Sequence, residues 1–239
     1  MTAWLRNLVG ASLLASGTCI EAQASESSTA AEIGSTAAVE PALLLVFGDS
    51  ITDGYGLQRE EAFPARLQQR VEARGWPVQV VNGGLSGETT AAGLRRIGWL
   101  LKRRFDYLLL ELGANDGLRG VPLSETRKNL QAIIDRVRAK YPHVEFVIAG
   151  MRIPPNLGAK YADEFAAIFP DLAEENGAAL IPFLLEGVGG VAELNLADGI
   201  HPTAKGHRIL ADNVWEVLEP LLAARFAPSE SKAEAEPLH

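Results

Sequence analysis

Cysteine is almost missing from this sequence, which contains a single one, Cys19, close to the amino terminus. If a leader ending at Ala24 is removed, as argued below, the mature chain has no cysteine, so disulfides cannot stabilise it. One cysteine and four histidines also provide little material for a transition-metal site. We therefore expect no metal and no cofactor.

Long apolar runs and an excess of basic charge are also lacking. The apolar run from 8 to 15 is too short to cross a bilayer, so we expect no stable membrane span. Asp and Glu number 30 against 22 Lys and Arg, and no basic stripe is dense enough to suggest a nucleic-acid partner. One cluster of basic residues is expected on the solvated face of a helix: Arg95, Arg96, Lys102, Arg103 and Arg104. The Gly-x-x-x-x-Gly-Lys-[Ser/Thr] loop that binds phosphates is absent from the chain, which argues against phosphoryl transfer.

The first 24 residues have the pattern of a signal peptide. Arg6 supplies the positive start, an apolar stretch follows, and Ala22-Gln23-Ala24 fits the small-residue cleavage site. Cleavage after Ala24 predicts a periplasmic or secreted protein. Lipid anchoring through Cys19 is the alternative, although Ser16-Gly17-Thr18 is a poor sequence to precede a lipidated cysteine.

The remaining chain divides into three parts by composition. Residues 25–40 are small and polar and predict a linker, and residues 227–239 are charged, rich in alanine and predict a disordered tail. The segment 41–226 between them has the size of one domain with one core. We expect it to be a monomer.

Within that domain, apolar runs alternate with helical patterns. The runs that predict strands are 43–47, 78–81, 107–112, 144–149 and 179–183. The predicted helices are 63–74, 89–105, 124–140 with Ser124 as N-cap, 161–176 and 203–226. This alternation predicts right-handed βαβ units, and thus an α/β fold: a three-layer α/β/α sandwich with a parallel, flavodoxin-like sheet of about five strands.

Four polar loops stand where this fold builds its binding sites. Gly48-Asp49-Ser50 follows the first predicted strand, the loop 82–89 follows the second, and 113–117 follows the third. The fourth, Asp198-Gly199-Ile200-His201-Pro202, leads into the last helix. The carboxyl ends of parallel strands meet at one edge of a sheet, so we expect these loops to converge.

Together the loops contain the parts of a serine hydrolase. Ser50 is the candidate nucleophile, His201 the base that takes its proton, and Asp198 the group that orients the imidazole. An oxyanion needs preorganised donors. The backbone N–H groups of Ser50 and Gly87 and the side-chain amide of Asn115 can provide them, since Gly87 has no Cβ to block a close approach.

Each of these residues has an ordinary structural interpretation when taken alone. Ser50 could cap a helix, Gly87 could serve a turn, and His201 could be a satisfied loop histidine. Asp116 is explained by an Asx turn. We interpret two further histidines, His143 and His207, as structural or surface residues. Unrelated turns have no reason to supply a nucleophile, a base, an orienting acid and oxyanion donors in matching positions, so the set favours catalysis.

The same blocks resemble those of the GDSL/SGNH hydrolase family. They are Gly48-Asp49-Ser50-Ile51, Gly87, Gly113-Ala114-Asn115-Asp116 and Asp198-Gly199-Ile200-His201-Pro202. The resemblance covers about residues 41 to 222 and implies the same roles for Ser50, Asp198 and His201 and for the oxyanion donors. Within the family, 112–120 and 151–156 look most like the periplasmic multifunctional esterases with arylesterase, acyl-CoA thioesterase and lysophospholipase activity. One departure is Glu88, where relatives often carry Asp.

The expected partner is a small acyl ester or thioester. Apolar residues of the two loops after the third and fourth strands are candidates to line a groove for the acyl chain: Leu118, Val121, Ile153, Pro154 and Leu157. An acetyl esterase acting on carbohydrate is the alternative on the same scaffold, although few aromatic residues are present to stack on sugars. A non-catalytic exported binding protein is a third interpretation, and it would make the complete set of catalytic residues accidental.

Overall fold

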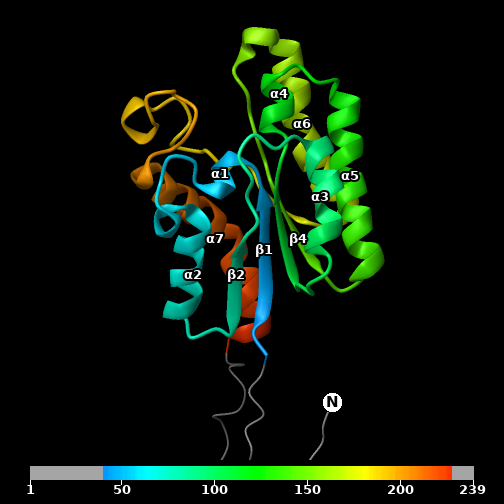
Figure 1. Ribbon diagram of the computed structural model, residues 1–239, viewed down its shortest axis with the longest axis vertical. Helices are drawn as coiled ribbons and strands as arrows, with labels where there is room; N and C mark the ends of the chain where they lie inside the picture. The colour runs from blue at the N-terminus through cyan, green and yellow to red at the C-terminus, as the bar shows by residue number, and fades with distance from the viewer. Residues whose placement is uncertain (1–39, 228–239) are drawn as a thin grey trace, which may run out of the picture. The chain divides into compact units, whose positions relative to one another are not determined.

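Five parallel strands form the centre of the protein, in the order β2-β1-β3-β4-β5 (Figure 1). The computed structural model describes residues 40–227, so the predicted signal peptide, nearly all of the linker and the tail from residue 228 lie outside the described residues. The strands are β1 (Ala42–Gly48), β2 (Val78–Asn82), β3 (Tyr107–Glu111), β4 (Glu145–Ala149) and β5 (Ala179–Ile181). The order is the flavodoxin-like one, which confirms the predicted fold class.

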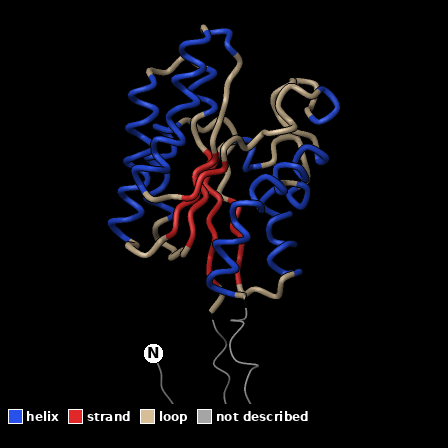
Figure 2. Tube along the Cα trace, turned by 180° about the vertical axis from the view of Figure 1, so that it is seen from behind, coloured by secondary structure: helices blue, strands red, loops and turns tan. Residues whose placement is uncertain are grey.

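Every residue of β1 is buried, as expected for a central strand that is covered on both faces. Its alternate side chains enter two separate cores. Leu44 belongs to the core shared with α2 (Phe63–Ala73) and α7 (Ala204–Phe226). Leu45 belongs to the core shared with α3 (Thr90–Leu100), α5 (Leu123–Lys140) and α6 (Ala159–Asn176). The two helical layers lie on opposite sides of the sheet in both views (Figures 1 and 2).

Two predicted helix boundaries are wrong. Helix α5 has Pro122 at its N-cap and begins at Leu123, so Ser124 lies inside the first turn and does not cap it. Proline at the boundary suits a helix start because its φ is already close to the helical value. Helix α3 ends at Leu100 instead of Phe105, and a turn then returns the chain so that Phe105 is buried.

Two short helices position the loops at the carboxyl edge of the sheet. Helix α1 (Ser50–Asp53) follows β1 directly, and α4 (Ala114–Leu118) follows β3 (Figure 1). Three 3-10 turns complete the described chain: η1 (Arg59–Glu61), η2 (Pro155–Leu157) and η3 (Ala192–Leu194). Within residues 40–227 none of the helices combines the length and apolarity that a membrane crossing requires.

Candidate active site

Ser50 stands on a sharp turn between the central strand and a helix. Strand β1 ends at Gly48, and Asp49 caps α1 by accepting a hydrogen bond from the Ile51 N–H to its Oδ1 at 3.1 Å. A Cβ on Gly48 would lie 2.1 Å from Thr52 Oγ1, so only glycine fits inside this turn. The turn leaves Ser50 9% exposed, with access to the cleft described below.

His201 connects Ser50 to Asp198. Its Nε2 lies 3.0 Å from Ser50 Oγ, and its Nδ1 lies 2.7 Å from Asp198 Oδ2. The ring of Tyr55 packs on the imidazole with 4.4 Å between ring centroids. The structure therefore brings together three predicted residues that are as much as 151 positions apart in the sequence.

The hydrogen bonds of Asp198 determine which nitrogen of His201 holds the proton. Asp198 Oδ1 accepts the backbone N–H groups of His201 (3.0 Å) and Ile200 (2.9 Å). These bonds, with the His201 backbone bond as the largest cause, lower the pKa of Asp198 to about 2, so the carboxylate is ionised at neutral pH. The other oxygen of this carboxylate, Oδ2, can only accept a hydrogen bond. His201 Nδ1 is therefore the donor to it, and His201 Nε2 is left as an acceptor for the Ser50 hydroxyl.

Asn115 and Gly87 lie near each other, and Arg119 contacts both. The Asn115 Nδ2 donates to Asp49 Oδ2 at 3.1 Å, and Arg119 Nη2 donates to Asn115 Oδ1 at 3.2 Å and to the Gly87 carbonyl at 3.4 Å. Gly87 has a φ of +78°, in the region that favours glycine. Ser50 and Asn115 line the cleft, whereas Gly87 is not among its lining residues.

A second carboxyl lies buried beneath the Ser50 turn. Glu111, at the end of β3, is 1% exposed, and its Oε2 accepts from Thr52 Oγ1 (2.6 Å) and from the Thr52 and Asp49 N–H groups (3.2 Å each). Burial is the main cause that raises the pKa of Glu111 well above its usual value, and the nearby Asp49 carboxylate adds to it. Burial likewise raises the pKa of Asp49 to about 6. We did not single out Glu111 from the sequence, although an acidic residue within the apolar run 107–112 is a signal that could have been used.

The loop that carries Gly87 is held by a buried ion pair. Glu88 is 4% exposed and is paired with Arg96 of α3, whose Nε donates to Glu88 Oε1 at 2.7 Å. The same guanidinium donates to the Gly83 carbonyl at 2.8 Å. The prediction that Arg96 lies on a solvated helix face is therefore wrong, because its guanidinium is bonded to acceptors of the preceding loop and its side chain is only 22% exposed.

The other polar residues near the site are structural. Asp116 accepts the N–H of Thr90 at 2.8 Å and the Thr90 hydroxyl at 2.5 Å, and thus ties α4 to the first turn of α3, whose N-cap is Thr89, instead of closing an Asx turn. His207 is buried and its Nδ1 accepts the Phe63 N–H at 3.1 Å, while burial lowers the pKa of His207 to about 4. His143 is exposed. Both histidines agree with our structural or surface interpretation.

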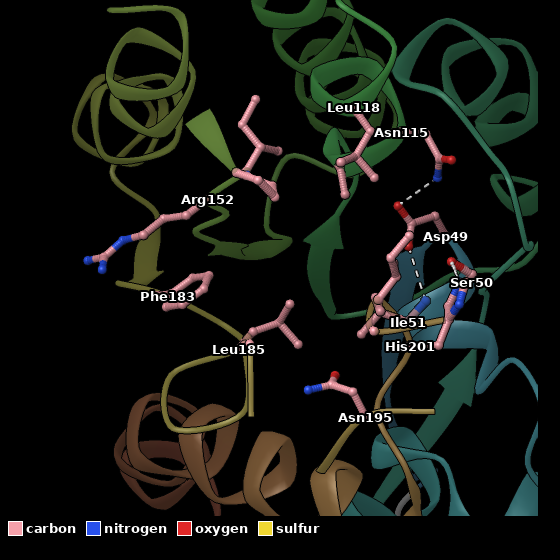
Figure 3. Close-up of a pocket in the computed structure, with 17 residues that line it drawn as sticks. Asp49, Ser50, Ile51, Asn115, Leu118, Arg152, Phe183, Leu185, Asn195 and His201 are labelled. Atoms are coloured by element: carbon pink, nitrogen blue, oxygen red, sulfur yellow. Dashed lines mark hydrogen bonds between the residues drawn. The ribbon is translucent and has the colours of Figure 1, made fainter. Parts of the chain in front are cut away.

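A cleft of about 370 Å³ extends from Ser50 and His201 across an apolar floor (Figure 3). Of the five predicted groove residues, three line it: Leu118, Ile153 and Pro154. Val121 and Leu157 do not line it. The Val121 carbonyl accepts the Tyr161 hydroxyl at 2.8 Å, which ties this part of the loop to α6. Leu157 is 47% exposed at the surface.

The opposite wall of the cleft comes from the segment after β5, which the sequence did not reveal as part of the site. It contributes Phe183, Leu185 and Asn195 (Figure 3). Arg152 also lines the cleft, with its guanidinium over the Phe183 ring at 4.8 Å from the centroid. The weak pattern of β5, a strand of three residues, explains why this wall was overlooked. Among residues 40–227 no group of three His, Cys, Asp or Glu side chains could hold a metal ion.

Comparison with known proteins identifies the family. A sequence model of the GDSL-like lipase/acylhydrolase family matches residues 46–209, more than half of the chain. The chain belongs to this family.

Several relatives that are similar in sequence are named as esterases or thioesterases. Esterase TesA of Pseudomonas aeruginosa is 41% identical over 180 residues, which cover 75% of this chain and 89% of the relative. A thioesterase 1/protease 1/lysophospholipase L1 of Escherichia coli K12 is 37% identical and is covered to 84%, again over 75% of this chain. A crystal structure of TesA superposes with a TM-score of 0.71 at 39% identity, covering 75% of this chain and 99% of that one. This GDSL protein is an ester-bond hydrolase with the fold of its family.

Proposed function

We propose that this enzyme hydrolyses carboxylic ester and thioester bonds of acyl substrates through a Ser-His-Asp triad and an acyl-enzyme. The observation that carries the proposal is the 3.0 Å approach of His201 Nε2 to Ser50 Oγ, with Asp198 on the other ring nitrogen. A neutral imidazole in this tautomer can accept the serine proton.

In the first half of the reaction Ser50 Oγ attacks the carbonyl carbon while His201 Nε2 takes its proton. The negative charge develops on the former carbonyl oxygen, which the N–H groups of Ser50, Gly87 and Asn115 stabilise. The intermediate collapses, His201 gives the proton to the leaving alcohol or thiol, and the acyl group stays esterified to Ser50. Asp198 remains ionised throughout and stabilises the transient imidazolium.

Water completes the cycle by the reverse sequence. His201 takes a proton from water as the oxygen attacks the acyl carbon, and the same donors bind the second oxyanion. His201 then returns the proton to Ser50 Oγ, and the free acid leaves. Every proton that His201 accepts is returned within the same half-reaction, so no other acid or base is required.

The lining of the cleft supports the proposed substrate class. Next to Ser50 the cleft is lined mainly by apolar side chains, among them Ile51, Leu118 and Leu185, while Arg152 and Asn195 are polar members of its lining (Figure 3). Burying methylene groups there is favourable by about 0.8 kcal/mol each. The cleft therefore suits an acyl chain of medium length, in keeping with the arylesterase, thioesterase and lysophospholipase activities of the type it resembles and with the printed names of its relatives.

The test is hydrolysis by the purified protein of p-nitrophenyl esters of graded chain length, of acyl-CoA and of an acetylated sugar. We expect turnover of medium-chain esters and of acyl-CoA, and its loss in Ser50→Ala. Ser124→Ala, an exposed serine on α5, is the matched control and should keep full activity. Undiminished activity in Ser50→Ala would refute the mechanism, and turnover confined to the acetylated sugar would favour the carbohydrate esterase.

A further inference from the structure

The side-chain amide of Asn115 is held at one end by Arg119 and at the other by Asp49. Arg119 is a donor at every nitrogen, so the atom 3.2 Å from its Nη2 must be the amide oxygen. An ionised Asp49 carboxylate can only accept, so the atom 3.1 Å from its Oδ2 must be the amide nitrogen. Only one of the two amide orientations satisfies both neighbours.

This orientation decides whether Asn115 can serve as an oxyanion donor. Its Nδ2 carries two hydrogens, and Asp49 takes one of them. The second is free for a substrate oxygen, and Asn115 lines the cleft together with Ser50 (Figure 3). If the amide were turned over, its oxygen would face the cleft and would repel the developing negative charge.

We propose that Arg119 is a positioning residue, which fixes the amide of Asn115 so that its N–H group, and not its oxygen, faces the reacting carbonyl. The inference rests on the proposed function, because it assigns a partner to one of the oxyanion donors. Arg119 is exposed and follows α4, so its effect comes from these direct contacts and not from packing in the core.

The same guanidinium also restrains the second oxyanion loop. Its Nη2 lies 3.4 Å from the Gly87 carbonyl, on the loop after β2, while Asn115 belongs to the segment after β3. A Cβ built on Gly87 would meet no atom within 4 Å, so side-chain packing does not hold this position. One side chain thus links the two loops that supply two of the three proposed donors.

Protonation of Asp49 would weaken its preference for one orientation of the Asn115 amide. A protonated carboxyl is also a donor, and would then suit the amide oxygen as well as the amide nitrogen. The charged or titratable groups that face Asp49 are Glu111, Glu88 and His201, and burial raises its pKa to about 6. Because Arg119 cannot accept, it opposes the turned amide even when Asp49 takes up a proton.

A double-mutant cycle tests the proposal with kcat and KM measured on p-nitrophenyl butyrate. Asn115→Ala should lower kcat by about a hundredfold or more, the usual cost of one oxyanion donor. Arg119→Met should lower kcat by about tenfold, which corresponds to one charge-assisted hydrogen bond, with KM changed by less than about twofold. Arg119→Lys, which keeps a donor, should recover part of the loss.

The decisive measurement is the double variant Arg119→Met/Asn115→Ala. If Arg119 acts mainly through Asn115, adding Arg119→Met to Asn115→Ala should cost clearly less than the roughly tenfold it costs in the wild type, and what loss remains is that of the Gly87 contact. Arg136→Met is the matched control, since Arg136 is an exposed arginine of α5 that donates to the Leu94 carbonyl of α3. Its kcat should stay unchanged. The acid side of the kcat profile should also move to higher pH in Arg119→Met and not in Arg136→Met.

Three results would overturn the proposal: unchanged kcat in Arg119→Met, a loss in the double variant equal to the product of the single losses, or a rise in KM alone. The last would make Arg119 a substrate contact. Should Arg119→Met fail to fold, as judged by circular dichroism, the cycle is run with Arg119→Gln. These outcomes can be told apart from failure of the proposed function, which is shown by activity retained in Ser50→Ala or by turnover confined to the acetylated sugar.

Discussion

The Nδ1 atom of His201 lies 2.7 Å from Oδ2 of Asp198, a residue only three positions earlier in the same loop. The other oxygen of Asp198 accepts the backbone N–H groups of Ile200 and His201, so one short turn sets both the position and the ionisation of the carboxylate. The proposed base and the group that orients it are therefore positioned by the same loop, and Ser50 is the partner that the rest of the fold must bring to them.

The first prediction concerns this pair. Asp198→Asn should lower kcat by about 10⁴-fold. An amide nitrogen facing His201 Nδ1 favours the imidazole tautomer that carries the proton on Nε2, and a protonated Nε2 cannot accept the proton of Ser50. Steady-state kinetics on p-nitrophenyl butyrate check this. Asp171→Asn, an exposed acid on α6, is the control and should be indistinguishable from the unchanged protein. A loss below about tenfold in Asp198→Asn would contradict the assigned tautomer.

The second prediction concerns the pH dependence of stability. The pKa of Asp49 rises from 3.8 to about 6 on folding, so the folded state binds this proton more tightly than the unfolded state. The corresponding stabilisation is present below pH 4 and is lost as the pH rises through about 6, and its size is about 3 kcal/mol. Urea unfolding of the wild type and Asp49→Asn between pH 4 and pH 8 measures it. The free energy of unfolding should fall more steeply with pH in the wild type, and parallel curves would refute the prediction.

The third prediction concerns the ion pair that holds the Gly87 loop. Glu88→Gln leaves Arg96, whose side chain is 22% exposed, without its buried counter-charge and should cost about 2 kcal/mol in the free energy of unfolding. Urea unfolding at pH 7 checks it. Glu175→Gln breaks the exposed pair with Arg127 and should change the same quantity by less than about 1 kcal/mol. Equal effects of the two variants would show that burial of Glu88 does not matter.

The fourth prediction concerns the acyl cleft. Leu118 lines it, so Leu118→Trp should fill part of its volume and lower kcat/KM for octanoyl esters by about tenfold relative to butyryl esters. Leu157→Trp is the matched control, because Leu157 belongs to the neighbouring loop region and does not line the cleft. Its ratio of octanoyl to butyryl activity should stay as in the wild type. A shift of the same size in both variants would place the acyl chain elsewhere.

Much of the fold could be predicted from local patterns. Short apolar runs between helical stripes are sufficient to indicate parallel strands, and all five strands and all five long helices occur where they were expected, with shifts at their ends. The predicted order of the sheet is confirmed as well. The ends of the helices were predicted less accurately than their positions, because the residue at a helix end depends on the chain around it. At α5, for example, Pro122 and not Ser124 occupies the N-cap.

The sequence by itself determined which chemical groups are available: one serine after the central strand, and a histidine and an aspartate in one short loop. Their convergence could be inferred because parallel strands present their carboxyl ends at a single edge. What only the tertiary structure decided are contacts between side chains from different loops. Arg119 meets Asn115 and Gly87, Glu111 lies beneath the Ser50 turn, and the segment after β5 closes the cleft. Periodicity reports which face of an element is buried, but the distance between two polar atoms on separate loops depends on how the whole sheet and its helices pack.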